Sequence, residues 1–311
     1  MSQSASNLAW SGVIPAITTP FDEHGSIDHS FLARHAKWLV EEGCTGVVVC
    51  GSLGEGGSLS IGEKAQVFST CVTAVGRQAP VIAAVSALTT KEAIEIAKVA
   101  EDHGCRGLMV LPPYVYVGDW REMKAHVGAV LSASRLSAML YNNPIAYKVD
   151  FLPNQVAELQ SEHANLHAVK ESSADVRRVA ALRELVGDGI KILVGVDDLI
   201  VEALLIGAEG WVAGLVNAFP RESVDLFNLA KAGNFVDAME LYKWFLPLLR
   251  MDTVPKFVQL IKAVQQEIGQ GSARVRAPRL ELSAAELAEV RAILEQANAH
   301  RPKVSAVTQP A

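Results

Sequence analysis

The stretch KILVGVDDLIVEALLIGAEGWVAGL, residues 191–215, predicts a complete strand–helix–strand unit. Residues 191–196 form a short apolar run, residues 197–206 carry apolar side chains at helical spacing, and residues 210–215 form a second apolar run. Both runs are continuously apolar instead of alternating with polar residues, which is typical of strands whose two faces are buried in a parallel sheet. The stretch therefore indicates two parallel strands joined by a helix.

The same alternation extends through most of the chain. Predicted strands cover residues 13–18, 46–50, 80–85, 107–113, 137–144, 166–172, 191–196 and 210–215. Predicted helices cover residues 29–42, 61–75, 89–103, 120–132, 153–160, 174–186 and 197–206, and another begins near residue 220. Further helices are predicted near residues 235–250, 254–268 and 283–298. These segments make eight consecutive strand–helix units followed by helices alone.

Eight such units close most economically into a (β/α)8 (TIM) barrel, an α/β fold. A doubly wound sheet is the competing arrangement, but the first strand–helix turn lacks the G-x-G-x-x-G fingerprint, and the isolated glycines of GSLGEGG (51–57) are a weak signal. We expect a catalytic barrel over residues 9–233 and a C-terminal helical layer over residues 234–300. Residues 301–311 are expected to form a disordered tail.

Composition excludes several classes of protein. Half of the 311 residues are hydrophobic and the net charge is −6, which argues against nucleic-acid and anionic-membrane partners because both favour basic surfaces. No apolar run is long enough for a transmembrane helix, and the first residues lack the features of a secretion signal. We expect a cytoplasmic protein whose four cysteines are buried thiols. These are Cys44, Cys50, Cys71 and Cys105.

A lysine stands at the end of the sixth predicted strand, where LHAVKESS (166–173) runs from apolar residues straight into Lys170. Active sites of (β/α)8 barrels lie at the C-terminal ends of the strands. An amine held against apolar walls loses solvation, which favours its uncharged, nucleophilic form. The alternative is that Lys170 marks the exit to solvent and pairs with Glu171 or another neighbour.

Residues at the ends of two other strands favour the chemical interpretation. Tyr141 ends the fifth predicted strand, and a tyrosine beside a Schiff-base lysine relays protons. Gly51 and Ser52 follow the second strand, where small residues expose backbone N–H groups and a hydroxyl suited to a carboxylate. A rim tyrosine and an ordinary turn are the structural alternatives, but three such elements converge on one end of the barrel.

Three motifs carry a resemblance to a known family. GSLGE (51–55), YNNP (141–144) and AVKES (168–172) resemble, in order and spacing, the dihydrodipicolinate synthase/N-acetylneuraminate lyase family of class I aldolases. The resemblance extends over nearly the whole chain, from residue 12 to residue 283. It implies a homotetramer built from dimers that uses neither a metal nor a dissociable cofactor for its chemistry.

The resemblance also implies roles for individual residues. Lys170 would form the Schiff base with pyruvate or a related 2-oxo acid, and Tyr141 would be the general acid and base. Gly51, Ser52 and the backbone beside them would hold the substrate carboxylate. Gly214, which opens the segment GLVNAFPRE, is assigned to the substrate site as well.

Several positions assigned to the substrate site depart from the family pattern of dihydrodipicolinate synthase. Leu53 replaces a threonine whose hydroxyl forms hydrogen bonds in the pyruvate pocket, and Ala146 stands where an arginine holds a second carboxylate. Tyr114 is retained from a tyrosine pair, whereas Val115 replaces the tyrosine that reaches into a neighbouring subunit. Tyr116 is a candidate to replace that tyrosine.

These departures argue against the lysine-biosynthetic enzyme itself. Family members that act on other substrates fit better: 4-hydroxy-2-oxoglutarate aldolase, 2-keto-3-deoxy sugar acid aldolases and dehydratases, and pyrroline-4-hydroxy-2-carboxylate deaminase, which the segment at 194–222 resembles. The bond that is broken, C–C, C–O or C–N, stays open. Lysine-biosynthetic condensation and a catalytically inactive metabolite-binding barrel are the alternatives.

A metal-dependent aldolase is a further alternative. His163 and His167 have i, i+4 spacing, but no acidic cluster joins them and they are expected in the loop before the sixth strand. Asp197 and Asp198 are expected to cap the helix that follows the seventh strand, with a place in the distal substrate pocket as the alternative.

Overall fold

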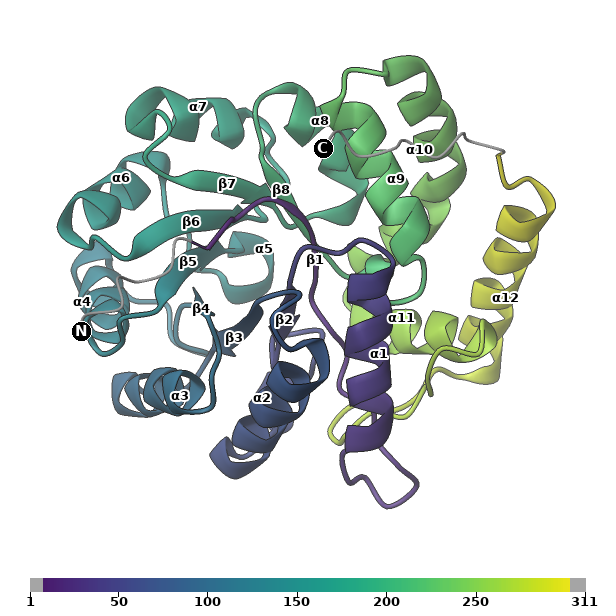
Figure 1. Cartoon of the computed structure of the whole chain (residues 1–311), viewed down its shortest axis with the longest axis horizontal. Helices are drawn as coiled ribbons and strands as arrows, with labels where there is room; N and C mark the ends of the chain where they lie inside the picture. The colour runs from purple at the N-terminus through teal and green to yellow at the C-terminus, as the bar shows by residue number, and fades with distance from the viewer. Residues whose placement is uncertain (1–7, 303–311) are drawn as a thin grey trace.

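The computed structural model describes residues 8–302, and the strands form an eight-stranded parallel barrel (Figure 1). Their order in the sheet is β1-β8-β7-β6-β5-β4-β3-β2. The strands are β1 (Gly12–Pro15), β2 (Val47–Val49), β3 (Val81–Val85), β4 (Gly107–Val110), β5 (Ser137–Asn142), β6 (Leu166–Glu171), β7 (Lys191–Val194) and β8 (Gly210–Ala213).

The barrel closes between its first two strands. Ala16 forms a parallel bridge with Val48, and the Ile17 N–H donates to the Val48 carbonyl oxygen at 2.9 Å. The predicted (β/α)8 fold is therefore confirmed.

Helices surround the barrel and follow each strand. They are α1 (His29–Glu41), α2 (Ile61–Val75), α3 (Thr90–Asp102), α4 (Trp120–Ser132), α6 (Pro153–Glu162), α7 (Arg177–Val186), α8 (Ile200–Leu205) and α9 (Pro220–Lys231). Local sequence explains where they begin: Ser60 and Asp119 form capping boxes with Glu63 and Glu122 at the starts of α2 and α4. One further helix, α5 (Pro144–Tyr147), has a single turn and was not expected from the sequence.

The C-terminal helices pack against one side of the barrel. They are α10 (Phe235–Leu249), α11 (Phe257–Glu267) and α12 (Ala284–Ala299), and α12 forms the outer edge of the molecule (Figure 1). The Trp244 indole N–H donates to the Ala297 carbonyl oxygen at 2.7 Å, which fastens α12 to α10. Helices thus follow the barrel as expected, although the division into two units stays a prediction. The expected disordered tail lies almost wholly outside the described residues.

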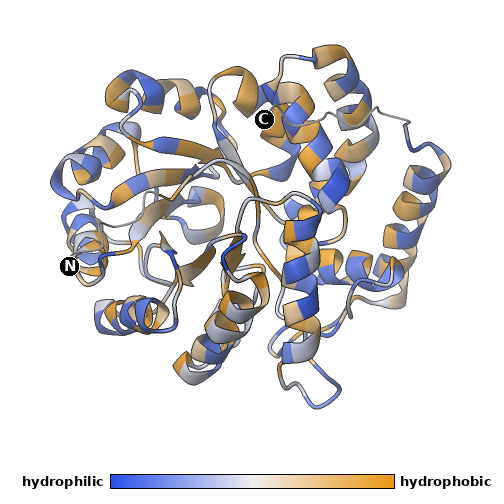
Figure 2. Cartoon of the chain, in the orientation of Figure 1, coloured by the Kyte–Doolittle hydropathy of each residue, from blue (hydrophilic) through white to orange (hydrophobic). Residues whose placement is uncertain are grey.

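The core follows the apolar pattern of the strands. All five residues of β3 are buried, and Figure 2 shows apolar residues along the strands and on one side of the surrounding helices. In α3 the buried residues are Ala93, Ile96, Ala97 and Ala100, a spacing that forms one helical face. The four cysteines are buried and free, as expected. Within residues 8–302, no helix is long and apolar enough to span a membrane.

Candidate active site

Lys170 and Tyr141 are neighbours on adjacent strands. They are register partners on β6 and β5, so their side chains leave the sheet on the same side. Lys170 is only 6% exposed, and its Nζ atom lies 4.2 Å from the centroid of the Tyr141 ring. The Asn143 amide donates to the Tyr141 hydroxyl at 2.9 Å, which fixes the phenol beside the amine. The predicted amine and proton relay are thus brought into contact.

Gly195 makes room for the lysine. A Cβ atom at this position, directly after β7, would lie 2.2 Å from Lys170 Cε and 2.1 Å from Ser172 Oγ. Any side chain at residue 195 would displace Lys170, so glycine is required there for the amine to keep its position. Ser172 is 1% exposed, and its Oγ has no hydrogen-bond partner within residues 8–302. A free hydroxyl therefore accompanies the lysine chain.

A tyrosine cluster connects the lysine to the loop after β2. The Tyr147 ring lies edge-on to Tyr141 at 5.8 Å between centroids and against Tyr114 at 5.6 Å. The Tyr147 hydroxyl is hydrogen-bonded to Ser52 Oγ. Burial, together with the two neighbouring phenols, raises the pKa of Tyr147 well above its usual range. Tyr147 is therefore a neutral phenol that joins the predicted residues Ser52, Tyr114 and Tyr141 into one cluster.

Sequence reasoning did not assign Tyr147 to the site, although a local signal was present. Asn143 caps α5 by accepting a hydrogen bond from the Ala146 N–H at 2.9 Å, and Pro144 occupies the first helical turn. This Asn-Pro start produces one helical turn that returns Tyr147 toward the strand ends. Ala146, the predicted site residue, lies exposed on the same turn.

The loop after β2 is held in a strained backbone conformation. Cys50 and Glu55 have φ values of 58° and 53°, in the left-handed region that non-glycine residues rarely adopt. A Cβ atom on Gly56 would lie 1.8 Å from the Cys50 carbonyl oxygen, so the turn requires glycine there. Gly51 and Leu53, both predicted site residues, are buried in this loop. The tight turn fixes the position of the loop against the barrel.

Asp197 does not cap a helix, so that expectation was wrong. Its side chain is fully buried and accepts hydrogen bonds from the Trp211 indole at 3.0 Å, the Gly214 N–H at 3.1 Å and the Leu215 N–H at 2.9 Å. The carboxyl turns inward because Trp211 lies on β8 and Gly214 and Leu215 directly follow it. Burial raises the pKa of Asp197 to about 6, although the hydrogen bonds and Lys170 oppose the shift.

Asp252 approaches the same place from the C-terminal layer. It ends the short turn Arg250–Asp252, and a Cβ atom on Gly214 would lie 1.9 Å from Asp252 Oδ1. Burial and the negative charge of Asp197 raise the pKa of Asp252 well above its usual range, whereas the charge of Lys170 opposes the shift. The predicted residue Gly214 therefore lies between two carboxyl groups that both sense the lysine charge.

The chain is similar to known proteins over most of its length. The model of the dihydrodipicolinate synthetase family matches residues 9–297. The chain belongs to this family. A 4-hydroxy-tetrahydrodipicolinate synthase of Methanothrix thermoacetophila is 34% identical over 284 residues, covering 91% of this chain and 95% of the relative.

Solved structures of the dihydrodipicolinate synthase family superpose on most of this chain and on nearly all of their own length. The 4-hydroxy-tetrahydrodipicolinate synthase of Methylacidiphilum fumariolicum SolV superposes with a TM-score of 0.90 at 28% identity, covering 93% of this chain and 96% of the other. YagE of Escherichia coli K12, a family member solved in complex with pyruvate, superposes with a TM-score of 0.88 at 25% identity, covering 93% and 99%. Class I aldolase chemistry at the family level is therefore shared, and the specific reaction is a separate question.

The segment expected to reach another subunit extends away from the tyrosine cluster. Tyr116 is 49% exposed, and its hydroxyl donates to Glu122 Oε1 at 2.7 Å, near the start of α4. Val115 is 98% exposed and has a φ of 54°. Within one chain, Tyr116 does not join Tyr114. Its role in a neighbouring subunit stays a prediction.

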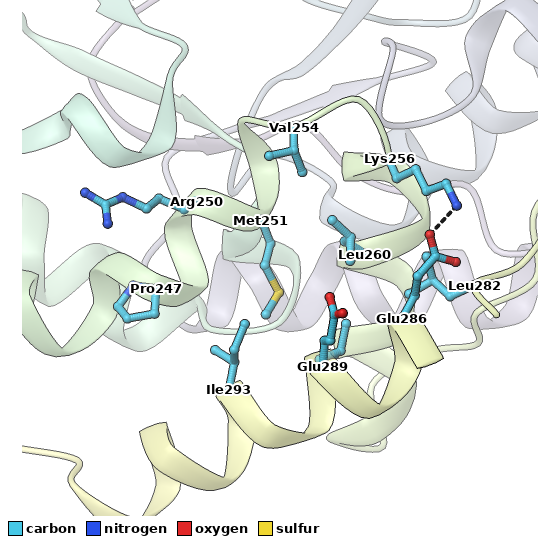
Figure 3. A pocket seen from close by; sticks show the side chains of 11 residues that line it. Pro247, Arg250, Met251, Val254, Lys256, Leu260, Leu282, Glu286, Glu289 and Ile293 are labelled. Carbon is cyan, nitrogen blue, oxygen red and sulfur yellow. Dashed lines mark hydrogen bonds and ion pairs between the residues drawn. The ribbon is translucent and has the colours of Figure 1, made fainter. Parts of the chain in front are cut away.

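A groove of about 300 Å³ lies between α10, α11 and α12 and is lined by residues other than the predicted site residues (Figure 3). Met251 and Ile293 form its apolar walls, and Lys256 pairs with Glu286 at its rim.

Within residues 8–302, no group of three or more histidine, cysteine, aspartate or glutamate side chains is arranged to hold a metal ion.

Proposed function

We propose that this family member is a lyase in which Lys170 forms a Schiff base with pyruvate or a related 2-oxo acid. The observation that carries the proposal is the contact of the buried Lys170 amine with the Tyr141 ring at the C-terminal ends of β5 and β6. In this mechanism the uncharged amine attacks C2 of the oxo acid. Tyr141 delivers a proton to the carbinolamine oxygen, and water leaves to give the imine.

The loop after β2 is proposed to bind the carboxylate of the oxo acid. Ser52 supplies a hydroxyl that Tyr147 orients, and Gly51 leaves its backbone N–H accessible to an anion. Once the carboxylate is held there, C2 is presented to the amine. The imine then withdraws electrons from C3, and loss of a C3 proton gives an enamine that is poised to break or form a bond at C4.

The second half of the substrate is proposed to be uncharged. Ala146 offers no cation to a second carboxylate, whose charge-assisted hydrogen bond to arginine contributes about 1.5–3 kcal/mol. The carboxylate of Asp197, which three N–H donors stabilise, would repel an anion placed beside it. Both features favour cleavage, dehydration or deamination of a 2-keto-3-deoxy sugar acid or a similar compound.

Condensation of the lysine-biosynthetic type is the second candidate. It is favoured by the relatives at about 30% identity, which are 4-hydroxy-tetrahydrodipicolinate synthases. An inactive metabolite-binding barrel is the third, and it would not require the buried amine. We also propose the homotetramer of the family resemblance, which sedimentation velocity would test.

Borohydride trapping tests the Schiff base directly. The protein is incubated with pyruvate and sodium borohydride, and the labelled peptide is identified by mass spectrometry. A reduced pyruvyl adduct on Lys170 is expected. An adduct only with a longer 2-oxo acid would restrict the site to such acids, and the absence of any adduct would favour the binding protein. Assays with pyruvate and aspartate semialdehyde then distinguish condensation from the lyase reactions.

A further inference from the structure

Two carboxyl groups meet at a position where the chain has no side chain. Asp197 accepts the Gly214 N–H at 3.1 Å, and Asp252 Oδ1 occupies the space into which a side chain on Gly214 would extend. Asp197 follows β7, Gly214 follows β8, and Asp252 belongs to the C-terminal layer. Three distant parts of the chain thus build one acidic corner, and both of its carboxyl groups interact electrostatically with Lys170.

The surroundings of Asp197 and Asp252 indicate which of the two carboxyl groups is protonated. Asp197 accepts three N–H hydrogen bonds, which favour its ionised form. Asp252 accepts none from the residues that the structure describes, and the charges of Asp197 and Asp198 oppose its ionisation. A positive charge on Lys170 instead favours the ionised form of Asp252. Two neighbouring carboxyl groups that interact strongly share one proton. The proton lies on Asp252, because the hydrogen bonds to Asp197 stabilise the ionised form of Asp197.

We propose that Asp252 is a further catalytic acid, which donates its proton to the leaving group on C4 of a substrate bound to Lys170. The inference rests on the proposed Schiff base and deepens it, because it selects elimination at C4 as the reaction. The substrate class is then a 2-oxo acid with a hydroxyl at C4 and an uncharged group beyond it. Asp197 is a positioning residue that keeps the proton on its partner.

The elimination balances without an oxidant or reductant. The imine between Lys170 and C2 loses a C3 proton to Tyr141, and the electron pair forms the enamine. The C4–O bond then breaks, its electron pair stays on oxygen, and the oxygen takes the Asp252 proton and leaves as water. Hydrolysis of the resulting unsaturated imine frees Lys170, and solvent returns the proton to Asp252.

Gly214 connects this role to the sequence. Its φ of −97° suits any residue, so the backbone does not require glycine there. The requirement comes from Asp252 Oδ1, because a Cβ atom at 1.9 Å would force the carboxyl away. Gly214→Ala is therefore a second variant that displaces the proposed acid without removing it.

The test uses 4,5-dihydroxy-2-oxopentanoate as the probe, with products identified by NMR. Elimination of the C4 hydroxyl and hydrolysis of the imine yield 5-hydroxy-2-oxopent-3-enoate and water, and a shift of a proton from C5 to C3 converts this product into its tautomer 2,5-dioxopentanoate. Aldol cleavage yields pyruvate and glycolaldehyde instead. Asp252→Asn is expected to lower kcat about 10²–10⁴-fold with a nearly unchanged KM, and to lose the fall in kcat at high pH that a protonated acid imposes. Gly214→Ala should lower kcat in the same way, whereas Asp188→Asn, at a side chain that is 96% exposed, serves as the control.

Borohydride trapping of pyruvate on Lys170 tests the Schiff base separately from the role of Asp252. Asp252→Asn should trap pyruvate as well as the wild type does. Wild-type kcat in this variant, or a parallel loss of trapping and turnover, would overturn the catalytic role. If the wild-type protein traps pyruvate but cleaves the probe to pyruvate, or leaves it unchanged, elimination is wrong while the Schiff base stands. If the wild-type protein traps no 2-oxo acid, the proposed function itself fails.

Discussion

Two of the three lysines that are buried in the described part of the chain lie in very different surroundings. Lys262, on α11, is 1% exposed, and its Nζ atom donates to Glu55 Oε1 at 2.8 Å and to the Thr19 carbonyl oxygen at 2.9 Å. Lys170 is similarly buried but lies against the Tyr141 ring, and no carboxylate of the described residues is within ion-pair distance of it. The first amine is committed to the structure, whereas the second is left available for chemistry.

The difference follows from what each lysine organises. Burial lowers the pKa of Lys262, but Glu55 opposes this shift and keeps the pair together. Glu55 belongs to the strained loop after β2, so the ion pair anchors the loop that carries Ser52. Fixed hydrogen bonds make a lysine structural, and a proton-transferring neighbour in their place makes it a candidate reagent.

The largest effect is expected from Lys170→Ala, because the proposed Schiff base forms on the Lys170 amine. Exchange of the pyruvate methyl protons with deuterium, followed by NMR, should fall to the uncatalysed rate, since enamine formation requires the imine. The melting temperature should stay within a few degrees of the wild-type value. Near-normal exchange in this variant would show that Lys170 is not the reagent.

Tyr141→Phe is expected to slow the same exchange about 10²–10⁴-fold if the phenol transfers a proton. The ring and its contact with Lys170 are retained, so the substitution isolates the hydroxyl. Saturation kinetics provide the readout. A change confined to KM would reassign Tyr141 to substrate binding.

Lys262→Met should destabilise the fold, because the buried Glu55 loses its nearest cation and keeps only the Arg279 guanidinium at 3.8 Å. Breaking a buried pair in this way costs about 3–5 kcal/mol of unfolding free energy. Lys256→Met is the matched control: Lys256 pairs with Glu286 but is 54% exposed, and loss of an exposed pair costs about 0–1 kcal/mol. Urea unfolding measures both. Equal losses in the two variants would remove the distinction between a buried structural lysine and a surface one.

The smallest effect concerns Glu63, a partner of Arg276 beside the anchored loop. The hydrogen bond from Arg276 holds the pKa of Glu63 at about 2, below its ordinary value of 4.5. The stabilisation is therefore fully present above pH 4.5 and is lost as the pH falls through 2. Glu63→Gln should lower stability at pH 6 by about 1 kcal/mol or less and should flatten the acid dependence of the melting temperature. An unchanged acid dependence would contradict this assignment.

The barrel was predictable because its signal is repeated. Each strand is a continuous apolar run, and Lys170 stands out because a charge ends such a run at the rim where barrel chemistry occurs. Strands were expected to be longer than observed, since exit residues such as Leu111 are as apolar as the strand itself. The one-turn helix that places Tyr147 is too short for its period to be visible.

The acidic corner was beyond sequence reasoning for a different reason. Acidic residues after a strand usually cap the next helix, and the donors that draw Asp197 inward belong to the following strand–helix unit. Asp252 comes from the C-terminal layer, and its place over Gly214 depends on how that layer packs against the barrel. Contacts of this kind depend on tertiary structure, and no local sequence pattern predicts them.

Gly195 gives the site an uneven capacity for change during evolution. Its missing side chain is the volume through which the lysine passes, so nearly every substitution there would be as damaging as loss of the amine. Ala146, by contrast, is exposed on a one-turn helix and can vary without disturbing its neighbours. New substrate preferences would therefore arise at the outer turns of the barrel mouth, while the glycine beneath the lysine stays fixed.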